Sequence, residues 1–266
     1  MKDNTINECK NCGSENLENY CSKCGQLVYH KRFTLKSIFG FFLDAFNVEK
    51  GFINTAKMLL IKPGTVIKDY LNGKTKVYMN PLKFFLIIAG INAAIMIYFK
   101  IFDHNIERNT NLAGANEIAI QLSHKMSEIM KKYLHIIGIF IIPFISIMSK
   151  WFFRKKKLYY AEHLIINLFL SAELAIFAFF LNFFYYYFPL LYDYSLLVNF
   201  LLIATYISWS FSQIFDTSKF KAFIGALFAN YLGQFLFIFA FVLIFLIVLY
   251  FLKLMGFSLK EILGIT

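Results

Sequence analysis

The chain has 266 residues, of which 59% are hydrophobic, 20% are aromatic and 16% are charged, and its formal net charge is +11. Several stretches of about 20 residues carry almost no charge, which is long enough to cross a hydrocarbon core about 30 Å thick. This composition excludes an ordinary soluble globular domain and predicts an all-α integral membrane protein.

Residues 1–32 hold all four cysteines, in two Cys-x2-Cys pairs that are each followed by glycine: Cys9, Cys12, Cys21 and Cys24. Two thiolates at this spacing can hold one face of a tetrahedral Zn²⁺, and the second pair can close the other face. Four thiolates fill every coordination position, so a structural site is predicted rather than a catalytic one. The sequence therefore predicts a small zinc ribbon. Two disulfides are the alternative, and they require an oxidising compartment.

The charges around these cysteines are nearly balanced, with five basic and four acidic residues in the segment 1–32. Proteins that bind nucleic acids present a basic stripe or patch, so we expect no nucleic-acid partner. We expect the ribbon to bind a cytoplasmic protein instead, and the formation of homo-oligomers is left open.

Residues 33–83 are predicted to form short amphipathic helices on the membrane surface. Apolar residues recur there at helical spacing, but charges interrupt every run before it could span a bilayer. A break is expected at Pro63-Gly64 and a helix end at Asn72-Gly73. The three expected helices cover residues 33–46, 51–61 and 65–71.

The stretch 55–83, which we call the elbow, leads the chain into the first predicted span. Cations and interfacial aromatics mix near its end, where four residues could contact a lipid head group or a phosphate: Tyr70, Lys74, Lys76 and Tyr78. The simpler interpretation, a structural connection without a ligand, is favoured over a binding site.

Five apolar segments are predicted to cross the membrane within residues 84–252, and a short tail, 253–266, follows them. The five segments are 84–102, 134–153, 162–188, 194–215 and 222–252. The last one is longer than the hydrocarbon core requires, so we expect it to tilt or to protrude.

Lysine and arginine residues are distributed unevenly about these spans, with 20 on one side and seven on the other. Basic residues are enriched in cytoplasmic loops. We therefore expect a multi-pass protein of a bacterial inner (plasma) membrane, with a cytoplasmic N-terminus and an external C-terminus. The ribbon would then lie in reducing cytoplasm, where thiolates are favoured over disulfides.

Glu173 is the acidic residue that lies well inside a predicted span. A charge at that depth costs several kcal/mol unless it is neutral, paired or hydrated, so Glu173 is a candidate functional residue. Glu162 lies eleven residues earlier, about three helical turns, and is expected on the same face. The amides and hydroxyls of the spans are expected to act mainly in packing.

Three hypotheses for the function follow. The leading one is a non-enzymatic membrane adaptor or regulator whose ribbon binds a protein partner. The alternative is a transporter or permease component that uses Glu173 as a proton- or cation-linked carboxylate. A membrane enzyme acting on lipid is the least supported, because the common hydrolase, metalloprotease and nucleotide-binding motifs do not occur in the sequence.

The order of the segments along the chain also resembles that of a known family. A four-cysteine ribbon ending in Cys-Gly-Gln precedes the elbow, which contains Thr55, Pro63, Tyr70, Gly73, Lys74, Tyr78 and Pro81. This arrangement over residues 9–85 resembles a bacterial family of zinc-ribbon, multi-span membrane proteins of unknown function. The resemblance implies a helical membrane domain behind the ribbon, and it implies no particular activity.

Overall fold

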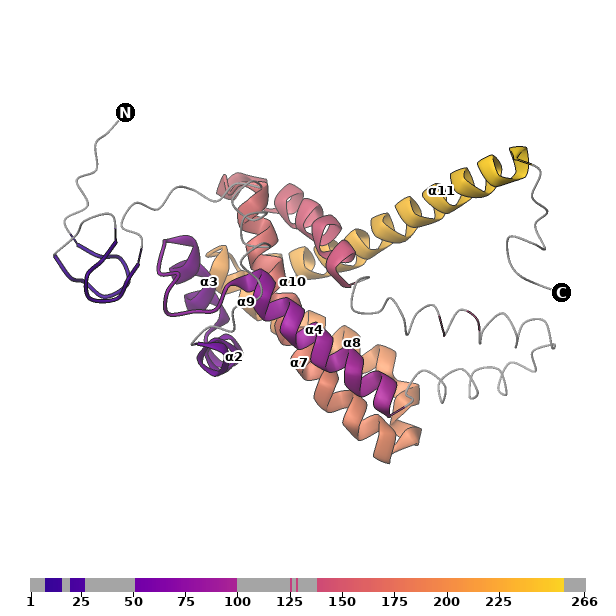
Figure 1. Cartoon of the computed structure of the whole chain (residues 1–266), viewed down its shortest axis with the longest axis horizontal. Helices are drawn as coiled ribbons and strands as arrows, with labels where there is room; N and C mark the ends of the chain where they lie inside the picture. The colour runs from indigo at the N-terminus through magenta and orange to yellow at the C-terminus, as the bar shows by residue number, and fades with distance from the viewer. Residues whose placement is uncertain are drawn as a thin grey trace.

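The protein is described by a computed structural model that covers residues 8–15, 20–26, 51–99, 125, 128 and 138–255. The predicted surface helix 33–46 lies outside these residues. Beyond the cysteine-containing segment, the described chain consists of helices joined by short turns, and no β-strand occurs in it (Figure 1). The all-α class predicted from the sequence is therefore confirmed for the described residues.

The elbow contains most of the short helix α2 (Phe52–Ile61) and all of the short helix α3 (Pro63–Leu71). The predicted break falls one residue earlier than expected, at Lys62. Pro63 is the first residue of α3, where its missing N–H and fixed φ are tolerated. At the other end of α3, Gly73 adopts a φ of 104°. The N–H of Lys74 donates to Asp69 O (2.9 Å), as in a glycine-terminated helix end.

The turn after α3 crosses the beginning of α2. The backbone N–H of Met79 donates to Thr55 Oγ1 over 2.8 Å, and both residues are buried. The side chain of Asn80 then accepts from the N–H groups of Leu82 (3.0 Å) and Lys83 (3.3 Å). Asn80 thus caps α4 (Pro81–Tyr98), the first long helix, because it satisfies N–H groups that lack intrahelical partners.

Four helices are long and apolar enough to cross a membrane: Pro81–Tyr98, Tyr160–Tyr187, Ser195–Ile214 and Lys219–Phe251. The first two are α4 and α7 (Tyr160–Tyr187). The third consists of α8 (Ser195–Leu202), the π-helical turn η3 (Ile203–Ile207) and α9 (Ser208–Ile214). The fourth consists of α10 (Lys219–Leu227), the π-helical turn η4 (Phe228–Leu232) and α11 (Gly233–Leu254).

These four helices correspond to the first, third, fourth and fifth predicted spans. The described part of the remaining span, predicted at 134–153, is a shorter apolar helix, Gly138–Phe152. Residues 131–137 lie outside the description, so the second predicted span, 134–153, stays a prediction, and with it the total of five spans.

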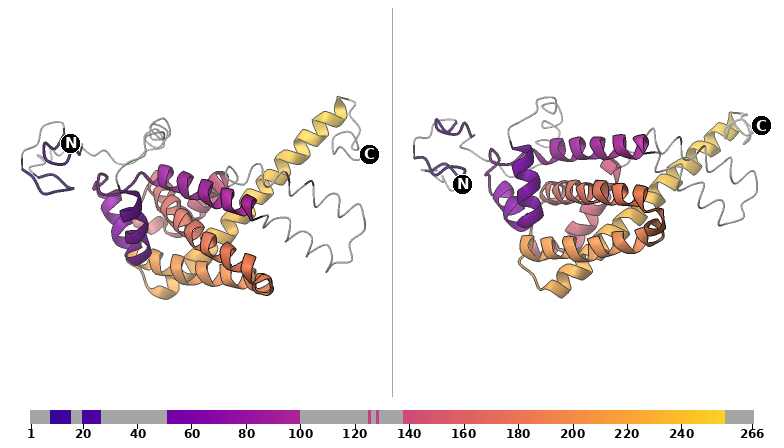
Figure 2. Two further views of the ribbon diagram at one scale, coloured as in Figure 1. Left: turned by 60° about the horizontal axis from the view of Figure 1, so that its bottom comes forward. Right: turned by 90° about the horizontal axis from the view of Figure 1, so that it is seen from below.

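α4 and α7 lie side by side, and the elbow packs across their ends (Figure 2). Aromatic rings fill this junction. Phe169 of α7 makes an edge contact with Tyr70 of α3 at 5.3 Å between ring centroids, and it contacts Phe84 of α4 at 6.4 Å. All three rings are buried, so the elbow and the first two long helices share one core.

α3 also packs against α9. The N–H of Gly64 donates to Gln213 Oε1 over 3.2 Å, and the two backbones approach closely. At the same junction Lys68 Nζ lies 2.6 Å from Asp216 Oδ1. The hydrogen bond from Lys68 lowers the pKa of the Asp216 carboxyl, which is exposed. The elbow is thereby fixed to a helix that lies more than 140 residues later in the chain.

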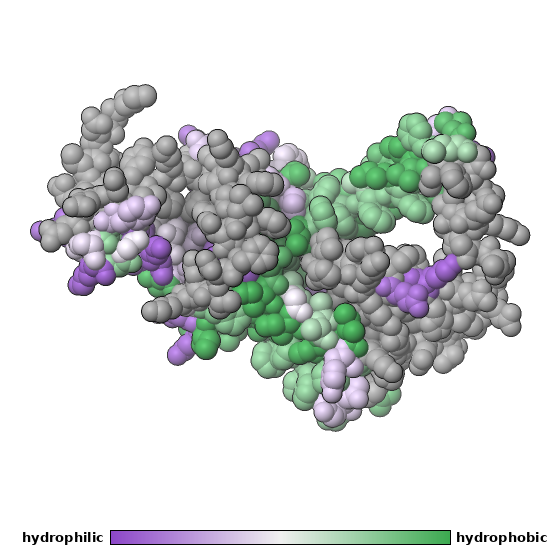
Figure 3. All heavy atoms as spheres, in the orientation of Figure 1, coloured by the Kyte–Doolittle hydropathy of each residue, from purple (hydrophilic) through white to green (hydrophobic). Residues whose placement is uncertain are grey.

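α11 extends away from the other helices (Figures 1 and 2). Apolar side chains are exposed on all of its faces, which gives the green arm in the upper right of Figure 3. A helix that is apolar all round is suited to lipid rather than to water. The expectation that the last predicted span tilts or protrudes in the membrane stays a prediction.

Candidate functional site

The four cysteines come together in the described residues of the N-terminal segment. Cys9 Sγ lies 3.6 Å from Cys24 Sγ, and Cys12 Sγ lies 3.5 Å from Cys21 Sγ. All four sulfur atoms lie within 4.8 Å of one another, and no disulfide joins them. The four thiols could therefore hold one metal ion.

Each Cys-x2-Cys pair is shaped by its following glycine. Gly13 and Gly25 both have a φ of 70°, a left-handed conformation that glycine adopts without steric cost. Their N–H groups donate to the carbonyls of Cys9 (2.8 Å) and Cys21 (2.7 Å). The two tight turns that result place both sulfur atoms of a pair on the same side.

The second Cys-x2-Cys-Gly turn also lowers the pKa of its first thiol, that of Cys21. The backbone N–H of Cys24, assisted by that of Lys23, donates to the Cys21 sulfur and lowers the pKa of this thiol to about 6. At Cys12, despite a backbone hydrogen bond at Ser14, desolvation and the neighbouring thiols raise the pKa of the thiol. Metal ions bind the thiolate form of cysteine. The backbone therefore favours the form of Cys21 that a metal ion would bind.

Gln26, directly after the second pair, attaches the cysteine segment to the elbow. Its side-chain Nε2 donates to Gly73 O, and the N–H of Lys76 donates to Gln26 Oε1 over 3.3 Å. The side chain is only 2% exposed. Gln26 was not a candidate in the sequence, and the Cys-Gly-Gln ending was the only signal that could have indicated it.

The four residues predicted as lipid or phosphate contacts do not form a single cation cluster. Asp69 lies between two of them: Lys74 Nζ is 3.1 Å from Asp69 Oδ1, and the Tyr78 hydroxyl donates to Asp69 Oδ2 over 3.3 Å. Burial and the neighbouring Asp69 raise the pKa of the Tyr78 hydroxyl to about 12. Tyr70 is buried against Phe169.

Lys76 is the fourth of these residues. Its backbone N–H donates to Gln26 of the cysteine segment, so this contact does not involve its side-chain charge. Internal partners thus account for Tyr70, Lys74 and Tyr78, which supports the structural interpretation of the elbow. A phosphate or lipid contact through these residues stays a hypothesis.

Glu162 lies at the start of α7 and has a local role. Its Oε2 accepts from the N–H of Tyr159 over 2.6 Å, and so it satisfies a backbone group just before the helix. Glu173 lies three turns further on, is 1% exposed, and its Oε2 has no hydrogen-bond partner among the described residues. The two carboxylates therefore have different environments despite their shared helix.

A second buried polar group joins the helix Gly138–Phe152 to α7. His163 Nδ1 lies 2.9 Å from Ser149 Oγ, and Asn167 donates to His163 O (2.8 Å) and to Ser146 Oγ (3.2 Å). A serine within hydrogen-bond distance of a histidine is a possible nucleophile–base pair by distance. Both side chains are completely buried, and His163 Nε2 has no hydrogen-bond partner among the described residues.

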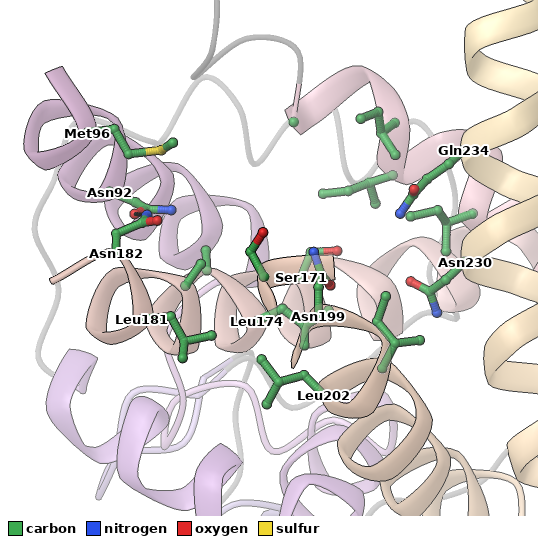
Figure 4. A pocket seen from close by; sticks show the side chains of 18 of the residues that line it. Asn92, Met96, Ser171, Leu174, Leu181, Asn182, Asn199, Leu202, Asn230 and Gln234 are labelled. Atoms are coloured by element: carbon green, nitrogen blue, oxygen red, sulfur yellow. Dashed lines mark hydrogen bonds between the residues drawn. The ribbon is translucent and has the colours of Figure 1, made fainter. Parts of the chain in front are cut away.

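A partly open cavity of about 690 Å³ lies between the long helices (Figure 4). Its walls are mostly aliphatic, and the amides and hydroxyls among its lining residues are Asn92, Ser171, Asn182, Tyr185, Ser195, Asn199, Asn230 and Gln234. Glu173 does not line it, although its neighbour Leu174 does. The sequence had assigned these amides to packing, since nothing in it shows that they share one space.

Residues 49–92 match a protein family described as a protein of unknown function (DUF3667). The match covers α2, α3, the turn and most of α4. No curated protein and no solved structure matches the chain. The similarity thus concerns the elbow and the first long helix, and it supplies no activity.

Proposed function

We propose that this protein is a non-enzymatic membrane adaptor or regulator, whose N-terminal zinc ribbon binds a cytoplasmic protein. The observation that carries the proposal is the convergence of all four cysteine sulfurs on one point, in a segment attached to the elbow through Gln26. A small module held next to the first long helix is suited to connecting a partner to the membrane domain.

Zinc is the metal that this site suits best. Zn²⁺ binds four thiolates at about 2.3 Å in a tetrahedron, whose sulfur–sulfur edges are then about 3.8 Å. Two of the observed distances between sulfurs are 3.5 and 3.6 Å. Four thiolates leave no coordination position for a substrate, which supports a structural role for the ion and a binding role for the module.

The experiment uses the full-length protein in living cells. The photoreactive amino acid p-benzoylphenylalanine replaces Tyr20, an aromatic residue of the module that is 62% exposed. We expect a crosslink to one cytoplasmic protein. We expect this crosslink to disappear in Cys21→Ser and to persist in Glu173→Gln, because only the first change removes a metal ligand.

A matched control places the same photoreactive residue at Phe239, an exposed position of the apolar arm α11. It should not crosslink to the cytoplasmic protein. Metal analysis of the purified protein should give one zinc per chain for the parent and none for Cys21→Ser. A crosslink from Tyr20 that survives zinc loss, or no crosslink at all, would count against the adaptor.

A transporter or permease component is the second candidate. Glu173 favours it, because a buried carboxylate oxygen without a hydrogen-bond partner among the described residues is typical of groups that exchange protons or cations. Its position outside the lining of the large cavity speaks against a direct contact with a substrate held there. The adaptor therefore stays first.

A further inference from the structure

The cavity between the long helices has a lining that no role in the adaptor explains. Helix α4, the helix Gly138–Phe152, α7, α8 and the η4–α11 segment all contribute to it. We infer that it binds an uncharged amphiphile, a lipid whose head group carries hydroxyl or carbonyl oxygens. This inference is independent of the zinc ribbon and of its partner.

The size and walls of the cavity suit such a molecule. Its volume of about 690 Å³ falls in the range of about 300–1,000 Å³ that is typical of small-molecule sites. Aliphatic side chains such as Ile142, Leu174 and Leu202 form most of the walls. An acyl or prenyl chain can lie along them, whereas a sugar or another fully polar solute would lose its hydration without replacement.

The polar groups set the chemistry of the head group. Carboxamides both donate and accept hydrogen bonds, and none of the described lining residues carries a charge. Asn92 and Asn182 interact with each other over 3.4 Å, and Asn230 donates to Ala226 O over 2.9 Å. A phosphate or a carboxylate head group would find no countercharge here, so an uncharged head is selected.

Two of the side-chain amides have no partner among the described residues. The side chains of Asn199 and Gln234 form no hydrogen bond with another described residue, and both project into the cavity (Figure 4). An amide in hydrocarbon without a hydrogen bond costs free energy. Hydroxyl or carbonyl oxygens of a bound lipid would satisfy both groups.

The cavity lies at the depth of a lipid head and upper chain. Ser171 is eleven residues into α7, which is about 16 Å from the lysine-rich end of the helix, and Asn182 is about 33 Å from it. The cavity therefore runs from near the middle of the bilayer toward the side opposite the basic loops. A lipid can reach it from within that leaflet.

The test uses the full-length protein in nanodiscs of phosphatidylethanolamine and phosphatidylglycerol. Three diazirine-bearing probes with comparable chains are compared: a diacylglycerol with a free hydroxyl, a quinone with carbonyl oxygens, and an anionic phosphatidylglycerol. Labelled peptides are identified by mass spectrometry. We expect one or both uncharged probes to label the cavity helices about tenfold more than the anionic probe, because a charge without a partner is excluded there.

Two variants change the cavity in different ways. Asn199→Leu removes one polar group, and labelling should fall about fivefold with the loss of one hydrogen bond. Ala178→Phe fills space without removing a polar group, and it should reduce labelling as well. Asn72→Leu, the same chemical change at an exposed position of the elbow, is the matched control and should leave labelling unchanged.

Labelling by a single uncharged probe would support the inference and identify the head group. Three results would overturn it: equal labelling by the phosphatidylglycerol probe, label spread evenly along the exposed arm α11, or labelling that neither Asn199→Leu nor Ala178→Phe reduces. Elution of each variant as a single species in size-exclusion chromatography confirms that it is folded.

Discussion

Glu173 lies in the interior of α7, and its environment distinguishes the two candidate functions. It is 1% exposed, and its Oε2 has no hydrogen-bond partner among the described residues. Glu173 is not among the residues that line the cavity, and a neutral group at this position could be accommodated by packing.

We predict that Glu173→Gln keeps its level in the membrane, its fold and its cellular phenotype. Glutamine has nearly the same shape and can form hydrogen bonds, but it cannot release a proton. Growth of a deletion strain complemented with the variant, together with its thermal unfolding midpoint, provides the measurement. A folded but inactive variant would instead place the transporter first.

Gly64 shows how one residue can control the contact between two helices. A Cβ atom at this position would lie 2.3 Å from Gln213 Cβ, which is too close for any real contact. We therefore predict that Gly64→Ala destabilises the protein by about 1–3 kcal/mol through overpacking of α3 against α9. The midpoint of thermal unfolding in detergent is the measurement.

Gly90 of α4 provides the matched control, since a Cβ atom there would have no atom within 4 Å. Gly90→Ala should be neutral or should stabilise by up to about 1 kcal/mol, because alanine is the better helix former. Equal effects of the two substitutions would contradict the close packing of α3 on α9.

At the scale of elements, the elbow explains much of its own sequence. Thr55 accepts a hydrogen bond from Met79, Gly73 provides the left-handed end of α3, and Pro81 begins α4 after the Asn80 cap. Each of these residues satisfies a backbone requirement within about 25 residues of itself. These residues lie within the part of the chain that matches the family model, residues 49–92, and each of them makes a structural contact there.

The contact between the cysteine segment and the elbow gives the next prediction. Because Gln26 Oε1 accepts from the Lys76 N–H, this amide should exchange slowly with deuterium in the parent protein. In Gln26→Ala its protection should fall about tenfold or more, since local opening controls exchange. Hydrogen exchange at single-residue resolution provides the measurement.

The Met79 N–H, which donates to Thr55 within the elbow, is the internal control and should keep its protection. Zinc content should also be unchanged in Gln26→Ala, because Gln26 is not a ligand. If the Lys76 amide stays protected in this variant, the cysteine segment does not dock as described. Loss of protection at both amides would show that the elbow itself had unfolded.

At the scale of the whole molecule, the basic residues predict the orientation in the membrane. The cysteine segment, the elbow and the loop at Arg154–Lys156 should all face the cytoplasm, because 20 of the 27 lysines and arginines lie on that side of the predicted spans. Reporter fusions at the N-terminus and at Lys155 should read as cytoplasmic. Fusions at Asn116 and at the C-terminus should read as external.

The C-terminal fusion is the decisive one for the number of spans. Five spans place the two termini on opposite sides, whereas four place them on the same side. A cytoplasmic C-terminus would show that Gly138–Phe152 does not cross the membrane, or that the long helix ending in α11 does not. Reporter activity at Lys155 then separates these two cases.

The sequence by itself determined the features that depend on near neighbours along the chain. The Cys-x2-Cys-Gly turns follow from local backbone geometry, and the long helices follow from runs of apolar residues. The break before α3 follows from Pro63 and the end of α3 from Gly73, each of which acts on N–H or carbonyl groups a few residues away. These predictions needed no knowledge of the packing.

Only the tertiary structure determined which faces of the helices pack against one another. In a membrane, lipid and protein interior are both apolar, so an apolar helix carries little signal for its orientation. The sequence could not show that Asn182 lines the cavity while Glu173 does not, nor that Gly64 meets Gln213. Such contacts join residues up to 149 positions apart, and the packing of the helices, not local propensity, fixes them.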